Sequence, residues 1–197
     1  MIPTVTSIDI SAVLAEFTAA YPSVHVRLHS GGSDRFISAI AEGTLDVAVL
    51  GLPSSHPPEA VASHCMGQDR LVAIVGDAHR FAGRKHLMLR DLEDEVFVDF
   101  PPGTPGRTQS DLAFAEAGIG RRVMFEVMST DLIIDLVAQG LAIGMLPAAA
   151  VEKRPGLHLV EVRDGPSRTE YIAWSDFNPS PAAQAFLTLV GIDAQDT

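Results

Sequence analysis

The stretch that decides the fold reads SDRFISAIAEGTLDVAVL, residues 33–50, and it has a second copy, TDLIIDLVAQGLAIGML, residues 130–146. Each copy predicts a short helix that begins at a hydroxyl residue, ends at a glycine and leads into a buried strand. Ser33 and Thr130 are the predicted helix caps, with Ser129 as an alternative contact in the second copy. Two such segments indicate two similar α/β lobes. A helix start with a hydroxyl in each lobe suits a small polar or anionic ligand.

The composition is typical of a folded globular protein. The chain has 197 residues, of which 47% are hydrophobic and 20% charged. Its net charge of −11 and the lack of a basic cluster argue against nucleic-acid binding by this stretch. No apolar run approaches the roughly 18 residues that span a bilayer, and no signal peptide is visible at the start. These features predict a cytoplasmic protein that does not contact membranes.

Helical and strand-like patterns alternate along the rest of the chain. Apolar residues at helical spacing predict a helix over residues 10–20, capped by Ser7 or Asp9. Alternation at Val24, Val26 and Leu28 predicts a half-buried strand. The further expected elements are strands over residues 45–50, 71–75, 96–100, 123–127, 141–146, 158–162 (an edge strand) and 171–174, and helices over 107–117 and 181–190.

This alternation predicts two sheets of largely parallel strands, one in each lobe. The weak linkers near Asp69 and Gly165 place the lobe boundaries there. We therefore expect one lobe over residues 1–69 plus 168–197 and the other over 70–167, with the last strand and helix returning to the first lobe.

Residues for catalysis or metal binding are not evident. Cys65 is the sole cysteine and is predicted to be a buried structural thiol. The seven histidines lack metal-type spacing, and no nucleophile–base pair or Gly-rich phosphate loop occurs. We therefore expect neither catalysis nor a cofactor, and we expect Trp174 to lie in the core.

A series of short motifs makes the pattern recognisable as a whole. In chain order they are FTAAYP (17–22), GS (32–33), GTLDVA (43–48), LVAIVGDAH (71–79), FVDFP (97–101), LVAQGLAIGMLP (136–147) and SPAAQAF (180–186). Together they span nearly the whole chain, which resembles the effector-binding domain of LysR-type transcriptional regulators. The resemblance implies an α/β, type 2 periplasmic-binding-protein-like fold, in which two crossover strands join two α/β lobes and the ligand binds in the cleft between them.

The resemblance also implies partners. Members usually act in the cytoplasm, and their effector domains usually pair side by side as antiparallel homodimers, here through the helices at residues 10–20 and 131–139. Two features depart from the family: its winged helix-turn-helix is absent, and the first strand of the fold is nearly missing. We therefore expect a fragment of a longer regulator, which forms higher oligomers and contacts DNA only through the missing N-terminal domain.

The family's effector contacts fall on four loops of this sequence. A small-molecule effector is expected there, with carboxylates and other anions among the candidates. Val49-Leu50-Gly51 stands where some members carry a ligand-binding arginine, which puts a dicarboxylate in doubt. Arg35 or Arg107 could substitute, although a solvated or carboxylate-paired arginine is favoured for both. The expected effector-binding residues are Thr4, Val5, Thr6, Ser33, Pro102, Gly103, Thr104, Ser129 and Thr130.

The sequence thus predicts an effector-sensing regulatory domain that modulates transcription through a dimer. A stand-alone solute-binding protein of a transporter is the alternative, and it predicts an export signal upstream in the gene. An enzyme on the same lobed fold is disfavoured, because the residues for a catalytic site are not evident.

Overall fold

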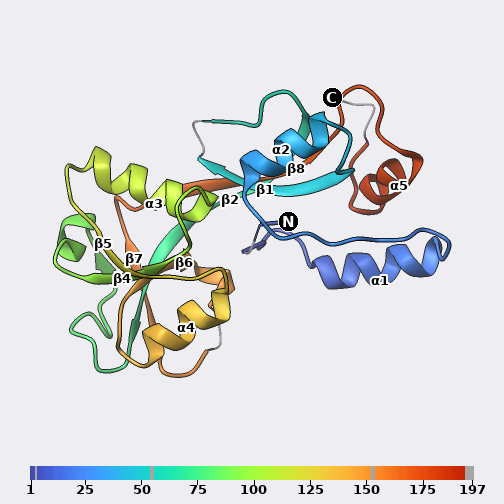
Figure 1. Ribbon diagram of the computed structural model, residues 1–197. Coiled ribbons are helices and arrows are strands. Elements are labelled where there is room, and N and C mark those ends of the chain that lie inside the picture. Colours follow the sequence, from blue (N-terminus) through green and yellow to red (C-terminus); the bar gives the residue numbers. More distant parts are fainter. Residues whose placement is uncertain (3, 54–55, 152–153, 194–197) are drawn as a thin grey trace. The chain divides into compact units, whose positions relative to one another are not determined.

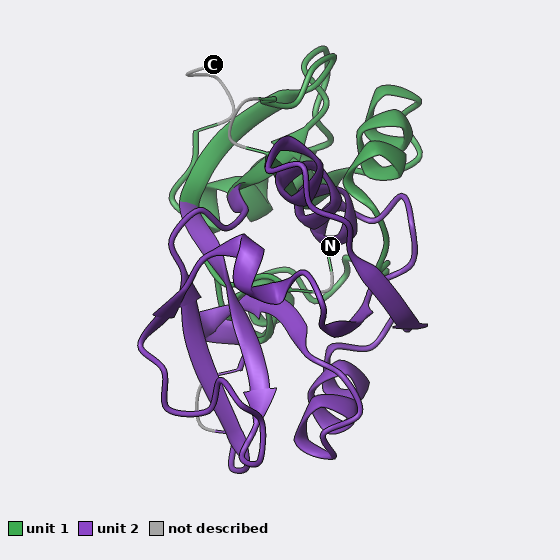
Figure 2. Cartoon of the chain, turned by 90° about the vertical axis from the view of Figure 1, so that its left-hand side faces the viewer, with its two compact units in different colours: residues 1–67, 169–197 green, residues 68–168 purple. Residues whose placement is uncertain are grey.

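A computed structural model describes residues 1–2, 4–53, 56–151 and 154–193. The chain divides into two compact units, Met1–Gly67 with Thr169–Thr197 (unit 1) and Gln68–Arg168 (unit 2). Two strands, β2 (Ala62–Gly76) and β8 (Ser167–Trp174), each begin in one unit and end in the other (Figure 2). The expected boundaries lay at 69/70 and 167/168.

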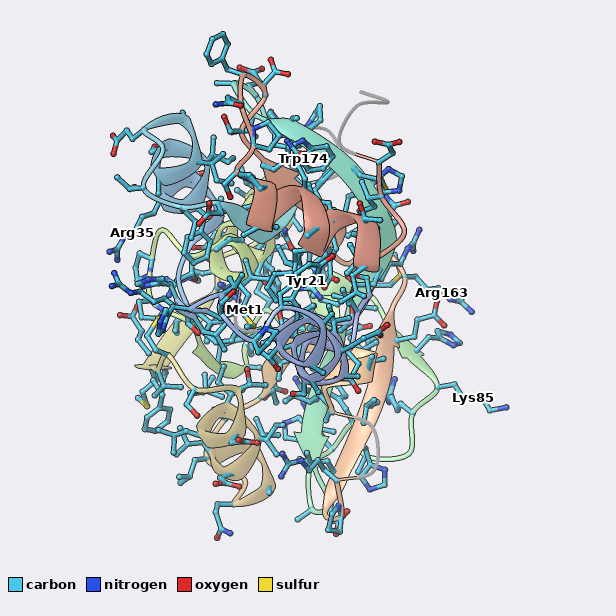
Figure 3. All side chains as sticks on the ribbon, turned by 90° about the vertical axis from the view of Figure 1, so that its right-hand side faces the viewer. Met1, Tyr21, Arg35, Lys85, Arg163 and Trp174 are labelled. Atoms are coloured by element: carbon cyan, nitrogen blue, oxygen red, sulfur yellow. The ribbon has the colours of Figure 1, made fainter. Side chains whose placement is uncertain are left out.

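Unit 1 contains three helices and β1 among its described residues. They are α1 (Ile10–Ala20), α2 (Ser33–Ala41), β1 (Val47–Pro53) and α5 (Pro181–Leu189) (Figure 1). Phe36 and Ile40 of α2 pack with Leu50 of β1, because helical spacing gathers the apolar residues on one face. Trp174 is buried with Leu187 of α5, as predicted (Figure 3).

Unit 2 follows the chain in alternating strands and helices. Its elements are β3 (His86–Leu87), the 3-10 helix η1 (Leu89–Leu92), β4 (Val96–Asp99), α3 (Pro105–Glu116), β5 (Arg122–Glu126), α4 (Thr130–Ala138), β6 (Gly144–Pro147), the 3-10 helix η2 (Ala148–Ala150) and β7 (Leu157–Val162). Two buried apolar clusters form its core, one around Phe97, Phe114 and Ile143 and the other around Ile133 and Val137.

The larger sheet is mixed, which corrects the expectation of largely parallel strands in both sheets. One six-stranded sheet has the order β1-β8-β2-β7-β3 with β6 also on β2, and a two-stranded sheet pairs β4 with β5. β4 and β5 are parallel, whereas β2 pairs with both β6 and β7 in antiparallel orientation. β7 lies between β2 and β3, so it is not the predicted edge strand. β7 is internal because β3 pairs with its other edge, in parallel orientation.

Two further expectations are wrong. Residues 24–29 form no strand and are mostly exposed, Leu28 to 60%. Cys65 is exposed and not buried, because it lies on an exposed stretch of β2 between Ala62 and Leu71. No helix of the described residues is both long enough and apolar enough to span a membrane.

Candidate functional site

The first expected loop, residues 4–7, is held by a buried carboxylate of unit 1. Thr4 is 8% exposed and Thr6 is half-buried. The Thr6 backbone N–H donates to Oε1 of Glu170 at 3.0 Å, and the Ser7 N–H donates to Oε2 at 2.9 Å. Both hydroxyls also donate to this carboxylate. Glu170 therefore fixes the loop directly before α1, whose cap is Asp9, one of the two predicted candidates.

Ser33 is buried at the start of α2, but it is not the helix cap. Gly32 is the N-cap, and because glycine has no side chain it makes no capping hydrogen bond. The Ser33 hydroxyl instead exchanges two hydrogen bonds with the backbone of Gly51, both at 3.1 Å. At the first helical position its side chain lies against β1, which corrects the predicted capping role. The first N–H groups of α2 consequently have no side-chain cap among the described residues.

β1 pairs with the segment that precedes the first expected loop and with the start of α2. The Ile2 N–H donates to the Val49 carbonyl at 3.2 Å, two residues before Gly51, which binds Ser33. The Gly31 N–H in turn donates to the Met1 carbonyl. Residues 1–2 and the start of α2 therefore lie beside the same part of one strand.

In unit 2, the expected loop 101–104 follows β4 and leads into α3. Thr104 is the N-cap of α3, but its hydroxyl donates to the Pro101 carbonyl at 2.8 Å and caps no helical N–H. Pro102 and Gly103 are exposed. Gly103 has a φ of 81°, a left-handed conformation that favours glycine. The α3 start, like that of α2, is left without a side-chain cap.

The fourth loop precedes α4, and here the choice between two hydroxyls is settled for the cap. Ser129 is the N-cap and its Oγ accepts from the Leu132 N–H at 3.3 Å, so the preference for Thr130 was wrong. The Val127 N–H donates to the Asp99 carbonyl, which ties the end of β5 to the end of β4. Loops 101–104 and 128–130 thus follow the carboxyl ends of two paired parallel strands, a common location for ligand sites in α/β proteins.

A buried ion network that the sequence patterns did not predict supports loop 101–104. Asp99 Oδ2 accepts from Nη1 of Arg121 at 2.7 Å, and both side chains are 3% exposed. The Arg121 guanidinium also lies against the rings of Phe97 and Phe114. Burial raises the pKa of Asp99 above its ordinary value of 3.8, while the charge and hydrogen bond of Arg121 oppose this. A lone aspartate inside the apolar FVDFP motif was the available signal.

Neither candidate arginine is both buried and available to a ligand. Arg107 is paired with carboxylates, and Arg35 is exposed to solvent. Arg107 binds Asp111 at 2.7 Å and Glu126 at 3.0 Å. Burial alone would lower the pKa of Arg107, but these carboxylates raise it, so it stays charged. Arg35 is exposed and extends away from the ribbon (Figure 3). The carboxylate-paired and solvated interpretations are therefore confirmed.

A further ion pair, with a buried arginine, joins the two crossover strands. Arg168 of β8 donates to both carboxylate oxygens of Asp69 of β2, at 2.8 and 3.0 Å, and is 2% exposed. Both residues belong to unit 2, next to the points where the two strands enter unit 1. A bidentate pair of this kind fixes the mutual register of two strands.

The described residues contain no group of three or more His, Cys, Asp or Glu side chains that could hold a metal ion. The four loops can form hydrogen bonds to a ligand through the N–H groups at the helix starts and through exposed backbone groups. Such groups bind and orient a ligand. The fold and these loops together define a ligand-binding α/β domain with two strands that pass between its units.

The chain belongs to the LysR substrate binding domain family, whose model matches residues 1–193. An HTH-type transcriptional regulator of Bacillus subtilis strain 168, YwbI, is 30% identical over 68% of this chain and 44% of its own length. The regulator SsuR of Burkholderia cenocepacia is 26% identical over 75% of this chain and 48% of its own. The chain therefore spans about half the length of these relatives.

Solved structures show the same fold. The effector binding domain of QuiR in complex with shikimate has a TM-score of 0.79 at 19% identity, covering 95% of this chain and 91% of that one. The Synechocystis PCC6803 CcmR regulatory domain in complex with 2-PG has a TM-score of 0.80 at 24% identity, covering 92% and 89%. The predicted family and the type 2 periplasmic-binding-protein-like fold are confirmed. These relatives are regulators, which gives the transporter alternative no support.

Proposed function

We propose that this chain is the effector-sensing domain of a cytoplasmic LysR-type transcriptional regulator. It binds a small molecule without transforming it. The ligand is held by residues of the four expected loops: Thr4, Val5, Thr6, Ser33, Pro102, Gly103, Thr104, Ser129 and Thr130. DNA contact belongs to a helix-turn-helix domain elsewhere in such a regulator.

One observation carries this proposal. Among the α-helices described, α1, α4 and α5 have side-chain caps from Asp9, Ser129 and Ser180, whereas α2 and α3 have none. An uncapped helix start presents N–H donors that an anionic or polar group of a ligand can satisfy. Both uncapped starts belong to loops on which the family binds effectors. The support is strongest for these two loops and weaker for the capped start of α4.

The proposed mechanism is a shift between conformations. An effector that binds one arrangement of the domain more tightly than another favours it by the difference in binding free energy. Pairing of two domains through α1 and α4 would pass this bias to the DNA-binding domains. Leu132 of α4 is 45% exposed, as a pairing surface requires. Light scattering at micromolar concentration tests the pairing, and a strictly monomeric particle contradicts it.

Thermal shift with a panel of aromatic acids, aliphatic acids, sugar phosphates and amino acids tests the effector site. A ligand at 100 times its Kd should stabilise the domain by about 2.7 kcal/mol. The double variant Thr4→Ala/Ser33→Ala should lose most of this shift. Ser180→Ala is the matched control, because it removes a cap hydroxyl from α5, outside the expected site. Equal ligand shifts in both variants would contradict the proposed site.

A further inference from the structure

Glu170 is a buried carboxylate that accepts hydrogen bonds from two consecutive residues of the expected effector loop. It is 2% exposed on β8, within unit 1. Oε1 accepts from the N–H and hydroxyl of Thr6, both at 3.0 Å, and Oε2 accepts from the N–H of Ser7 at 2.9 Å and from its hydroxyl. Donors on both oxygens match the acceptor-only form of an ionised carboxylate.

This arrangement is that of an anion site filled from within the protein. Consecutive N–H groups just before a helix, joined by two hydroxyls, are what a loop offers to a bound carboxylate or phosphate. A buried carboxylate needs such donors, because burial of an unpaired charge is costly. Glu170 thus uses donors of Thr6 and Ser7 that a ligand would otherwise occupy.

We propose that Glu170 is a specificity-determining residue that excludes carboxylate and phosphate groups of an effector from Thr6 and Ser7. A second anion there would find these donors engaged and would meet the charge of Glu170. The group of an effector that lies against this loop is therefore uncharged or cationic. This inference rests on the proposed function, and it narrows the expected effector chemistry: an anionic group has to bind elsewhere, as at the uncapped start of α2.

Chemical rescue tests the inference without knowledge of the effector. Glu170→Ala leaves the donors of Thr6 and Ser7 facing a space of carboxylate size, so its Tm should fall by about 10 °C. Sodium acetate at ten times its Kd should then restore about 3 °C, whereas sodium chloride at equal ionic strength should not. Acetate should shift neither the wild-type protein nor Glu170→Gln, which fills the space with an amide.

The outcomes separate this inference from the proposed function. If Glu170→Ala does not fold, acetate-dependent recovery of its circular dichroism signal supports the inference equally, and no acetate response in either form overturns it. An acetate shift in the wild-type protein that disappears in Thr6→Val also overturns it. An effector panel that stabilises nothing would contradict the proposed function alone, because the acetate rescue does not depend on an effector.

Discussion

Two short segments that hold the same place in the order of elements have different structures in the two units. Residues 24–28 of unit 1 and 122–126 of unit 2 each follow one helix and precede another. In unit 2 the segment is β5, which pairs in parallel with β4. In unit 1 it forms no strand, since no described strand lies before α1 to take the place of β4. The spacing of apolar residues decides which side chains of a segment can be buried together. The segment becomes a strand only where a neighbouring backbone forms hydrogen bonds with it.

An apolar groove lies beside this segment of unit 1. Its volume is about 170 Å³, and α1 lines it with Ile10, Leu14 and Phe17. The other walls are residues 24–29, the start of β1 and α5. Met1 lies at its end, where the terminal ammonium donates to the His29 carbonyl at 2.6 Å. This surface of unit 1 therefore stays exposed. In unit 2, by contrast, β5 has the strand β4 of the same unit beside it.

The largest expected loss of stability comes from a substitution in β4, the strand that unit 2 has and the described part of unit 1 lacks. Phe97 of β4 is fully buried and packs edge-to-face on Phe114. Phe97→Ala should lower stability by about 3–5 kcal/mol, because it leaves a cavity in the unit 2 core. Chemical denaturation measures this. Leu28→Ala, in the exposed segment of unit 1 that has no described strand beside it, should change stability by less than about 0.5 kcal/mol. Similar losses in both variants would contradict the contrast.

The buried pair of Asp99 and Arg121 in unit 2 should make the free energy of unfolding depend on pH. Because burial raises the pKa of Asp99 above 3.8, the folded state holds this proton more tightly than the unfolded state. The resulting stabilisation is complete below about pH 3.8 and is lost as the pH rises through the raised pKa. The free energy of unfolding of wild type, relative to Asp99→Asn, should fall over this range by about 1.4 kcal/mol per unit of raised pKa. If the free energy of unfolding of wild type instead rises relative to Asp99→Asn as the pH increases, the pKa of Asp99 is lowered and the prediction is wrong.

A strand supplied to unit 1 should reduce the difference between the units. Five alternating valine and threonine residues fused ahead of Met1 should enter the groove beside residues 24–29 and raise stability by about 1–2 kcal/mol. Amide hydrogen exchange should show new protection at Val26 and Leu28. The control carries proline at alternate positions of the extension, which removes the ladder donors. Equal protection with both extensions would count against strand addition.

The smallest expected effect distinguishes the two hydroxyls at the α4 start. Ser129→Ala removes the bond to the Leu132 N–H and should cost about 1 kcal/mol. Thr130→Ala, at the first helical position, should cost less than about 0.5 kcal/mol. Thermal unfolding of the two variants side by side checks this, and the reverse order would restore Thr130 as the cap.

Local patterns predicted most elements of the fold. The α1 bounds, the Ser180 cap with Pro181 at the first helical position and the burial of Trp174 are as expected. Such features depend on residues within one or two turns, so a single sequence contains their signal. The site was harder to predict. Thr6, Ser33 and Thr104 were named for their hydroxyls, but the partners Glu170, Gly51 and Pro101 include residues distant in sequence.

The sequence by itself determined the repeated helix–strand units, the bounds of α1 and the family, because hydrophobic spacing and ordered motifs are properties of neighbouring residues. Only the tertiary structure decided that residues 24–29 form no strand, that β7 is internal, and that a buried Glu170 holds the loop before α1. Each of these depends on which backbone or carboxylate arrives from elsewhere in the chain. Hydrogen bonds form between groups that are close in space, and a one-dimensional pattern does not state that distance.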